Sequence, residues 1–230
     1  MPNLVIYDDL GLRDYKETWD YQESLFNAKV EEKRSPAADG AKTPDHLIFV
    51  EHNHVYTLGK SGSEQNLLLD YIQLQARDAS FYRIDRGGDI TYHGPGQLVG
   101  YPIFDLEEMK LGLRDYIHLL EEAIIMCISR FGIEGSRLEG ATGVWIDPDK
   151  GARARKMCAI GVRASRFVTM HGFALNVSTD LSYFNHINPC GFTDKGVTSI
   201  VKETGQEIAL EDVKRVMYDS MREVFGYEYY

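Results

Sequence analysis

Apolar residues that recur every three or four positions predict three helices. From Leu12 to Val30 the spacing is roughly that of one helix face. The clearest helix runs from about Leu113 to Phe131, with Gly132 at the position where a terminating glycine is expected. A last helix is predicted from about Leu210 to Phe225, again with its apolar residues on one face.

Short apolar runs between these helices predict β-strands. They cover residues 47–50, 55–58, 81–84, 97–106, 143–146, 157–162, 167–170, 173–177 and 197–201. Pro102 has no N–H to give to a neighbouring strand, so we expect its strand at a sheet edge or a bend. Ser35–Asp45 predicts a loop, and Asp147–Gly151 predicts a turn between two strands. Runs of strands with helices between them favour an α+β fold over a doubly wound sheet, in one domain spanning residues 1–230.

Composition places the chain among ordinary globular proteins, since 43% of its 230 residues are hydrophobic and 26% are charged. Its 35 acidic and 25 basic residues give a net charge of −10, which argues against nucleic-acid and anionic-membrane binders. We expect neither a signal peptide nor a membrane span, because no sufficiently long apolar run occurs. Three widely spaced cysteines without a CxxC pair are typical of free thiols in the cytoplasm.

The first candidate site is the segment Arg86–Gln97, which holds four glycines and one proline. Glycines permit positive φ angles and let a ligand approach the backbone closely. Arg86 adds a permanent cation and His93 a titratable imidazole. A purely structural interpretation, two tight turns with a surface histidine, remains open at this stage. Neither a dinucleotide-binding fingerprint nor a Walker A loop is present in the sequence.

Two further residues carry candidate chemistry. Cys190 lies between a proline and a glycine, a setting that favours an exposed and reactive thiol. Cys127 and Cys158 instead fall on apolar faces of a helix and a strand, which predicts buried structural residues. Lys156 opens an apolar strand, where loss of hydration favours the neutral amine and can create a general base.

A basic run extends from Lys150 to Arg166 without a single acid. It is either a solvated face or, through Arg153, Arg155 and Arg163, a docking patch for an acidic partner. His52 and His54 would share one face of an extended segment. No acid or cysteine accompanies them at metal-binding spacing, so we expect no metal site.

Four motifs in this order resemble the lipoate-protein ligase B family, the octanoyl-[acyl-carrier-protein]:protein octanoyltransferases. They are Arg86–Gln97, Lys156–Gly161, His171–Val177 and Asn188–Gly191. The resemblance implies a mixed, largely antiparallel sheet flanked by helices, as in the catalytic domain of biotin and lipoate protein ligases. It also implies that Cys190 forms a thioester with the acyl group and that Lys156 lowers the pKa of this thiol. The residues implied as walls of the acyl pocket are Arg86, Gly87, Gly88, Asp89, Ile90, Thr91, Tyr92, His93, Ala159, Ile160, Gly161, Gly172, Phe173 and Ala174.

The implied reaction moves an octanoyl or lipoyl group from acyl carrier protein to a lysine of a lipoyl domain, the first step of endogenous protein lipoylation. The implied acceptors are the lipoyl domains of 2-oxoacid dehydrogenase complexes and the glycine cleavage H protein. The acyl group arrives on phosphopantetheine, so neither ATP nor a metal is expected, and neither a nucleic acid nor a membrane is an expected partner. Two alternatives remain: an ATP-dependent lipoate-protein ligase, which would not need Cys190, and a non-catalytic acyl-carrier-binding module that kept the pocket.

Overall fold

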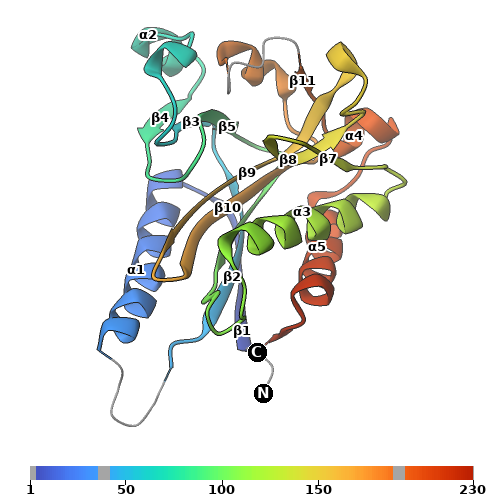
Figure 1. Ribbon diagram of the computed structural model, residues 1–230. Helices are drawn as coiled ribbons and strands as arrows, with labels where there is room; N and C mark the ends of the chain where they lie inside the picture. The colour runs from blue at the N-terminus through green and yellow to red at the C-terminus, as the bar shows by residue number, and fades with distance from the viewer. Residues whose placement is uncertain (1–3, 36–41, 189–194, 230) are drawn as a thin grey trace.

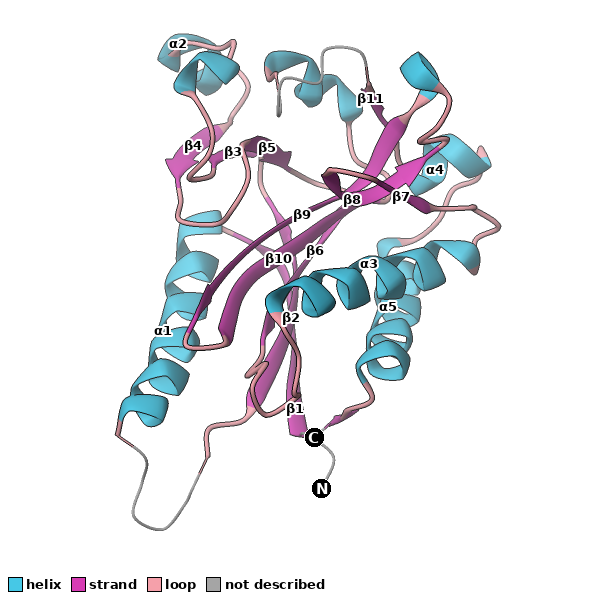
Figure 2. Ribbon diagram, viewed as in Figure 1, coloured by secondary structure: helices cyan, strands magenta, loops and turns pink. Residues whose placement is uncertain are grey.

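The computed structural model describes residues 4–35, 42–188 and 195–229. Within these residues a nine-stranded sheet runs in the order β12-β1-β2-β6-β10-β9-β8-β7, with β11 beside β9 (Figures 1 and 2). Its strands are β1 (Leu4–Arg13), β2 (Asp45–His52), β6 (Gln97–Ile103), β7 (Ser136–Leu138), β8 (Ala141–Ile146), β9 (Arg155–Ser165), β10 (Val168–Asn176), β11 (Gly196–Val197) and β12 (Glu228–Tyr229). β1 is parallel to β2 and β12, and β11 is parallel to β9, whereas the other pairs are antiparallel. The predicted mixed, largely antiparallel α+β fold is confirmed.

A second, three-stranded sheet lies next to the main one. Its central strand β3 (Val55–Leu58) is parallel to β4 (Ser80–Arg83) and antiparallel to β5 (Ile90–His93). Three short helical segments accompany it: η1 (Glu64–Asn66), α2 (Tyr71–Gln75) and η3 (Leu181–His186). This sheet and these segments enclose an apolar cluster of their own, separate from the main core.

Long helices cover both faces of the main sheet (Figure 1). Phe26 and Val30 of α1 (Tyr15–Arg34) pack against β2, β6 and β10 on one face. α3 (Leu113–Ser129) and α5 (Leu210–Phe225) bury their apolar sides on the other face, near the short helix α4 (Ile200–Thr204). The predicted second and third long helices are therefore confirmed to within two residues. No helix in the described part of the chain has the length and apolar character that crossing a membrane requires.

The first helix begins later than its apolar pattern predicts. The carboxylate of Asp14 accepts hydrogen bonds from the N–H groups of Lys16 (2.8 Å) and Glu17 (3.2 Å), so Asp14 is the N-cap. Leu12, which we expected in the helix, belongs instead to β1. The strand at Leu4–Arg13 was not predicted, because its alternation of apolar and polar residues is broken by two aspartates and a glycine.

The prediction that Pro102 would hold its strand at a sheet edge is wrong, because β6 lies between β2 and β10. The proline is tolerated because the ladder between β6 and β10 stops at the pair of Gly100 with Phe173. Pairing between these segments resumes at Asp105, beyond the proline. Thr169 donates its hydroxyl to the carbonyl of Pro102 across this interruption (2.9 Å). The alternative that we allowed, a bend, is therefore closer to the structure.

Two other strand predictions also change. The runs 167–170 and 173–177 form one strand, β10, in which His171 has a positive φ of 61°. The run 197–201 forms the two-residue strand β11 and then α4. Ser199 ends the extended segment because its hydroxyl caps α4 by accepting from the N–H of Lys202 (3.2 Å). The predicted turn after β8 is confirmed, and the short helix η2 (Gly151–Arg153) follows it.

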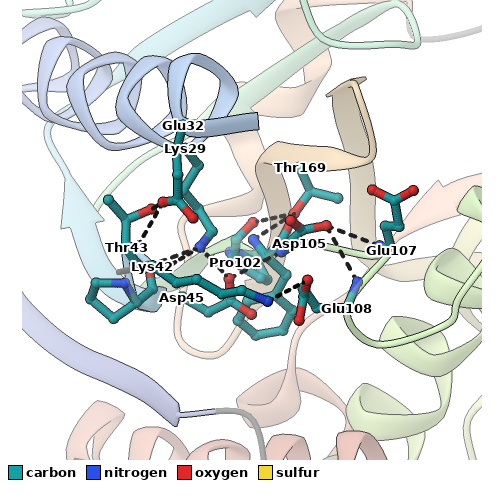
Figure 3. Close-up of polar contacts among 12 residues, drawn as sticks. Lys29, Glu32, Lys42, Thr43, Asp45, Pro102, Asp105, Glu107, Glu108 and Thr169 are labelled. Atoms are coloured by element: carbon teal, nitrogen blue, oxygen red, sulfur yellow. Dashed lines mark hydrogen bonds and ion pairs between the residues drawn. The ribbon is translucent and has the colours of Figure 1, made fainter. Parts of the chain in front are cut away.

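A network of charged residues ties the second half of α1 to the start of β2 and to the loop after β6 (Figure 3). The ammonium of Lys29 lies 2.9 Å from the carboxylate of Asp45 and donates to the carbonyl of Thr43 (2.7 Å). The same carboxylate accepts a hydrogen bond from the backbone N–H of Asp105 (3.0 Å). The side-chain carboxylate of Asp105 forms an ion pair with the ammonium of Lys33 (2.6 Å). Lys29 and Asp45 are both buried, so each depends on the other for compensation of its charge.

We expect Lys29→Met to lower the free energy of unfolding by about 3–5 kcal/mol, because it leaves the buried Asp45 carboxylate without its cation. Lys42→Met is the matched control, since the Lys42–Glu108 pair is largely exposed. Loss of that pair should lower the free energy of unfolding by less than about 1 kcal/mol. Urea unfolding of both variants measures the difference, and equal losses would contradict a structural role for the buried pair.

Candidate active site

A cavity of about 590 Å³ opens between the main sheet and the small sheet. The sequence-predicted wall residues that line it are Arg86, Gly87, Gly88, Asp89, Ile90, Thr91, His93, Ala159, Ile160, Gly161, Gly172, Phe173 and Ala174. Lys156 lines the same cavity. Three of the four predicted motifs, which are far apart in the sequence, therefore meet at one place.

Tyr92 is the one predicted wall residue that does not line the cavity. It packs behind the wall, where its ring stacks on Tyr183 with the centroids 4.9 Å apart. Its hydroxyl forms a hydrogen bond with Nδ1 of His54 (2.7 Å). Alternation along β5 separates Tyr92 from its neighbours Thr91 and His93, because neighbouring residues of a strand point to opposite faces.

Small side chains form the floor of the cavity. The register of β9 and β10 pairs Ala159 with Ala174 and Gly161 with Gly172. Cys158, one residue before Ala159, points away from the cavity into the core beneath α3. Alanine and glycine at adjacent positions leave space for a slender apolar ligand along these two strands.

The glycine-rich loop before β5 is fixed to both sheets and forms the roof. The N–H of Gly87 donates to the carbonyl of Val162 in β9 (2.9 Å). A Cβ atom at Gly161 would lie 3.0 Å from the carbonyl oxygen of Gly87, so the loop can approach β9 because residue 161 has no side chain. Arg86 is buried and donates from Nη2 to the carbonyl (2.8 Å) and the hydroxyl (3.0 Å) of Thr57.

A β-bulge directs Lys156 into the cavity. Val144 and Trp145 are consecutive in β8, yet their partners in β9 are Cys158 and Lys156, so Met157 is an extra residue. Consecutive residues of β8 face opposite sides, and paired residues share a side. Cys158 packs with Val144 in the core, and Lys156 therefore lies with Trp145 on the cavity side. A regular strand would have turned the lysine into the core.

The indole ring of Trp145 lies against Lys156. The ammonium nitrogen is 4.7 Å from the ring centroid, within the range of a cation–π interaction. The ring itself is fixed, since it is buried and its Nε1–H donates to the carbonyl of Ala141 (3.0 Å). This contact favours the ammonium form of the lysine and restricts where its nitrogen can lie.

His93 is not an acid–base group at neutral pH. Burial and, to a smaller extent, the nearby His52 lower its pKa to about 3, so the imidazole is uncharged. Its Nδ1 forms a hydrogen bond with the side-chain oxygen of Gln97 (2.9 Å), and its ring stacks on Tyr15. Burial likewise lowers the pKa of His52 to about 4. His93 lines the cavity, and His52 packs against it with the ring centroids 6.0 Å apart.

Cys190 lies outside the described residues, but the segments on both sides of it are placed. Asn188 donates its N–H to the carbonyl of Asn66 (2.9 Å). On the other side, Lys195 and the two residues of β11 line the cavity, and Val197 pairs with Lys156. The described residues that follow the fourth motif, from Lys195 to Val197, therefore line the cavity beside Lys156.

Three of the six cations in the basic run 150–166 form ion pairs with acidic residues. Arg155 forms ion pairs with Glu203 (2.6 Å) and Asp147 (2.7 Å), and Arg163 forms one with Asp85. Glu203 and Asp85 come from distant parts of the chain, which the sequence run could not reveal. Arg155 and Arg163 are therefore not the unpaired cations that the docking interpretation assumed.

The other cysteines have the structural role that we predicted. Cys127 and Cys158 are free and fully buried in the core between the main sheet and α3. Burial raises the pKa of the Cys127 thiol to about 12, so it is not a nucleophile at neutral pH. Within the described residues, no three His, Cys, Asp or Glu side chains are grouped so that they could hold a metal ion.

Several cavity residues were not identified from the sequence. Tyr15, Tyr101 and Trp145 enter the cavity from an N-terminal helix, a central strand and a neighbouring strand. Apolar and aromatic residues of this kind are usually core residues. Nothing in their spacing along the sequence distinguishes a core residue from one that lines a cavity. Trp145 could have been found by pairing β8 and β9 across the predicted turn, since a hairpin places it near Lys156.

Comparison with known proteins gives a consistent result. Residues 14–222 match the family model described as Lipoyl protein ligase A/B catalytic domain. The octanoyltransferase of Parabacteroides distasonis is 55% identical over 220 residues, which cover 96% of this chain and 98% of that protein. The octanoyltransferase of Christiangramia forsetii is 53% identical over 223 residues, with coverage of 96% and 95%. That of Bacteroides fragilis is 56% identical over 210 residues, with coverage of 91% and 93%.

Solved structures share the fold at much lower sequence identity. A bipartite lipoate protein ligase from Thermoplasma acidophilum superposes with a TM-score of 0.69 at 14% identity, covering 100% of this chain and 85% of that one. A lipoate-protein ligase A bound with ATP has a TM-score of 0.67 at 14% identity, with coverage of 100% and 88%. These likenesses confirm the predicted kind of catalytic fold.

We expect acid to destabilise the protein through its buried neutral histidines. The pKa values of His93 and His52 are about 3 and 4 in the folded chain, below the ordinary 6.5. The unfolded chain therefore binds more protons below pH 6.5, and stability falls as the pH falls. Below pH 6.5 the free energy of unfolding falls by up to about 1.4 kcal/mol per pH unit for each histidine. Urea unfolding from pH 7 to 4.5 measures this pH dependence. In His93→Gln the fall with pH should be smaller by the contribution of one histidine. An unchanged dependence on pH would contradict a buried neutral His93.

Proposed function

We propose that this chain, which belongs to the lipoyl protein ligase A/B catalytic domain family, is an octanoyltransferase that works through a thioester on Cys190. The names of the three relatives compared above, each more than 50% identical over at least 91% of this chain, support octanoyl transfer as its activity. One observation carries the mechanism. The bulge at Met157 turns Lys156 into an apolar cavity, next to the strand that follows Cys190 in the chain.

The first half-reaction moves the acyl group onto the protein. The thiolate of Cys190 attacks the carbonyl carbon of a carrier-bound octanoyl thioester, a new C–S bond forms, and the old C–S bond breaks when the tetrahedral intermediate collapses. The departing carrier thiolate takes up the proton of the Lys156 ammonium, which leaves the Lys156 amine neutral for the second half-reaction. The ammonium of Lys156, beside the indole ring of Trp145, favours the thiolate at the start and offsets negative charge during the attack.

The second half-reaction passes the acyl group to a protein lysine. The neutral amine of the acceptor attacks the Cys190 thioester, an amide C–N bond forms, and the thiolate of Cys190 leaves. The acceptor nitrogen loses one proton, which Lys156 can take when it is neutral. Exchange between two thioesters is nearly isoenergetic and aminolysis of a thioester is downhill, so the sequence of steps requires neither ATP nor a metal.

We propose acyl carrier protein as the donor. Lipoyl domains of 2-oxoacid dehydrogenase complexes and the glycine cleavage H protein are the proposed acceptors. The resemblance of the four motifs supports these partners, and so do the relatives' names, which imply an acceptor of octanoyl groups. The buried free thiols of Cys127 and Cys158 are consistent with a reducing cytoplasm as the site of the reaction.

The thioester can be tested by intact-protein mass spectrometry after mixing the enzyme with octanoyl-carrier protein, without ATP or acceptor. We expect a hydroxylamine-labile octanoyl adduct on the wild type and none on Cys190→Ser. Transfer to an acceptor without any adduct would mean direct transfer in a ternary complex. Transfer from free octanoate that depends on ATP would favour a ligase, and carrier binding without any transfer would favour a non-catalytic module.

We expect Trp145→Leu to lower kcat about tenfold, because the ammonium of Lys156 loses about 0.5–2 kcal/mol of attraction to the ring. Trp145→Phe keeps an aromatic face and should lose less. The matched control is Trp19→Leu, since Trp19 makes the same kind of contact with Lys16 (5.5 Å) but does not line the cavity. Steady-state transfer rates provide the measurement. A Leu variant with the kcat of the control would refute the role of the ring.

A further inference from the structure

A very short strand joins the segment that follows Cys190 to the main sheet. β11 consists of two residues, of which Val197 pairs with Lys156. Thr198, directly after β11, donates its N–H to the carbonyl of Lys156 (2.9 Å). Such a short ladder contributes little stability by itself, because even a complete isolated pair of strands is only marginally stable in water. The position of this segment beside Lys156 therefore depends on contacts from outside the ladder.

Asn176, the last residue of β10, supplies one of these contacts. Its Nδ2–H donates to the carbonyl of Thr198 (3.0 Å). Asn176 is 4% exposed and Thr198 is fully buried, so this hydrogen bond forms in surroundings of low polarity, where it is strong. Thr198 is thus held through both backbone groups, its N–H by Lys156 and its carbonyl by Asn176.

Gln97, the first residue of β6, orients the amide of Asn176. Its Nε2 donates to Oδ1 of Asn176 (2.9 Å) and to the carbonyl of Tyr92 (3.2 Å). A backbone carbonyl can only accept, so the contact with Tyr92 fixes which end of the Gln97 amide is the donor. The contact with the Thr198 carbonyl fixes the orientation of the Asn176 amide in the same way.

His93 of β5 begins this series of hydrogen bonds. Because Nε2 of Gln97 is the donor, its Oε1 accepts, and Nδ1 of His93, 2.9 Å away, carries the proton. Burial lowers the pKa of His93 to about 3, which keeps the ring neutral. The hydrogen bonds then point in one direction, from His93 through Gln97 and Asn176 to Thr198. Buried hydrogen bonds aligned in this way strengthen one another.

The side chain of Thr198 connects the same residue to β9 by a second route. Its hydroxyl donates to the carboxylate of Glu203 in α4. Glu203 forms an ion pair with Arg155 (2.6 Å), the residue that precedes Lys156 in β9. Contacts from β10 and from α4 therefore converge on the residue that follows β11.

We propose that Asn176 is a positioning residue that holds the segment after Cys190 against β9 and so keeps the thiol beside Lys156. This inference rests on the proposed function, in which the ammonium of Lys156 favours the thiolate of Cys190. Without the Asn176 N–H, the buried carbonyl of Thr198 is unpaired, and β11 can relieve this unfavourable state by moving toward water. The thiol then spends less time near the ammonium. The chemical step slows, whereas binding of the carrier protein at the surface is retained.

The first test compares the wild type with Asn176→Leu, which has a similar branched shape but cannot donate a hydrogen bond. We expect formation of the octanoyl adduct in a single turnover to slow at least about tenfold, with the KM for octanoyl-carrier protein within about threefold. Asn27→Leu makes the same change on the exposed side of α1 and should leave both values as in the wild type. An Asn176→Leu protein that forms the adduct at the wild-type rate, or whose loss is confined to KM, would overturn the proposal. A wild type without any adduct would refute the proposed function and this proposal with it.

The second test measures the thiol directly. Alkylation of Cys190 by iodoacetamide at pH 7, located by mass spectrometry, should be at least about threefold slower in Asn176→Leu, because less of the thiol is ionised without the nearby ammonium. General unfolding would instead expose the buried Cys127 and Cys158 and increase their labelling. Equal alkylation of Cys190 in the wild type and the variant would overturn the proposal. If Asn176→Leu does not fold, Asn176→Ala, which adds no bulk, takes its place in both tests.

Discussion

The register between β8 and β9 is the constraint on which the candidate active site depends. One extra residue in β9, Met157, places Cys158 and Lys156 on opposite faces of the sheet although they are only two positions apart. The cysteine packs in the core and the lysine enters the cavity. β11 pairs with the same part of β9, so the segment that follows Cys190 reaches the cavity at the lysine. The bulge thus places the chemistry of the site as well as the local strand geometry.

The cavity combines an apolar floor with buried polar groups at both ends, and each polar end needs support from outside the cavity. At the outer end, the ring of Trp145 provides a face for the Lys156 ammonium, and its own N–H is bonded to Ala141. At the other end, the carboxylate of Asp85 lies 3.0 Å from Nε2 of His171. Low polarity between these ends makes every polar group more consequential, because an unpaired group in such surroundings is costly.

Several charges of this protein are paired inside the fold. The basic run stands out in a chain with a net charge of −10, yet Arg155 and Arg163 are neutralised by acids from distant segments. The same holds for Lys29 and Asp45, a buried pair that links α1 to β2. A run of like charges in the sequence therefore says little about the electrostatic field at the surface. Residues that are distant in the chain but close in the fold decide how many charges of the run remain unpaired.

The sequence by itself determined the fold class, the two long helices that cover one face of the sheet and the motifs that meet at the cavity. It could do so because helix periodicity, turn residues and glycine-rich segments are local signals. Only the tertiary structure decided the central place of β6 and the single bent strand β10. These depend on which strands become neighbours, on where a ladder gains or loses a residue, and on which buried atoms find partners. Such contacts join residues far apart in the chain, and no local pattern encodes them.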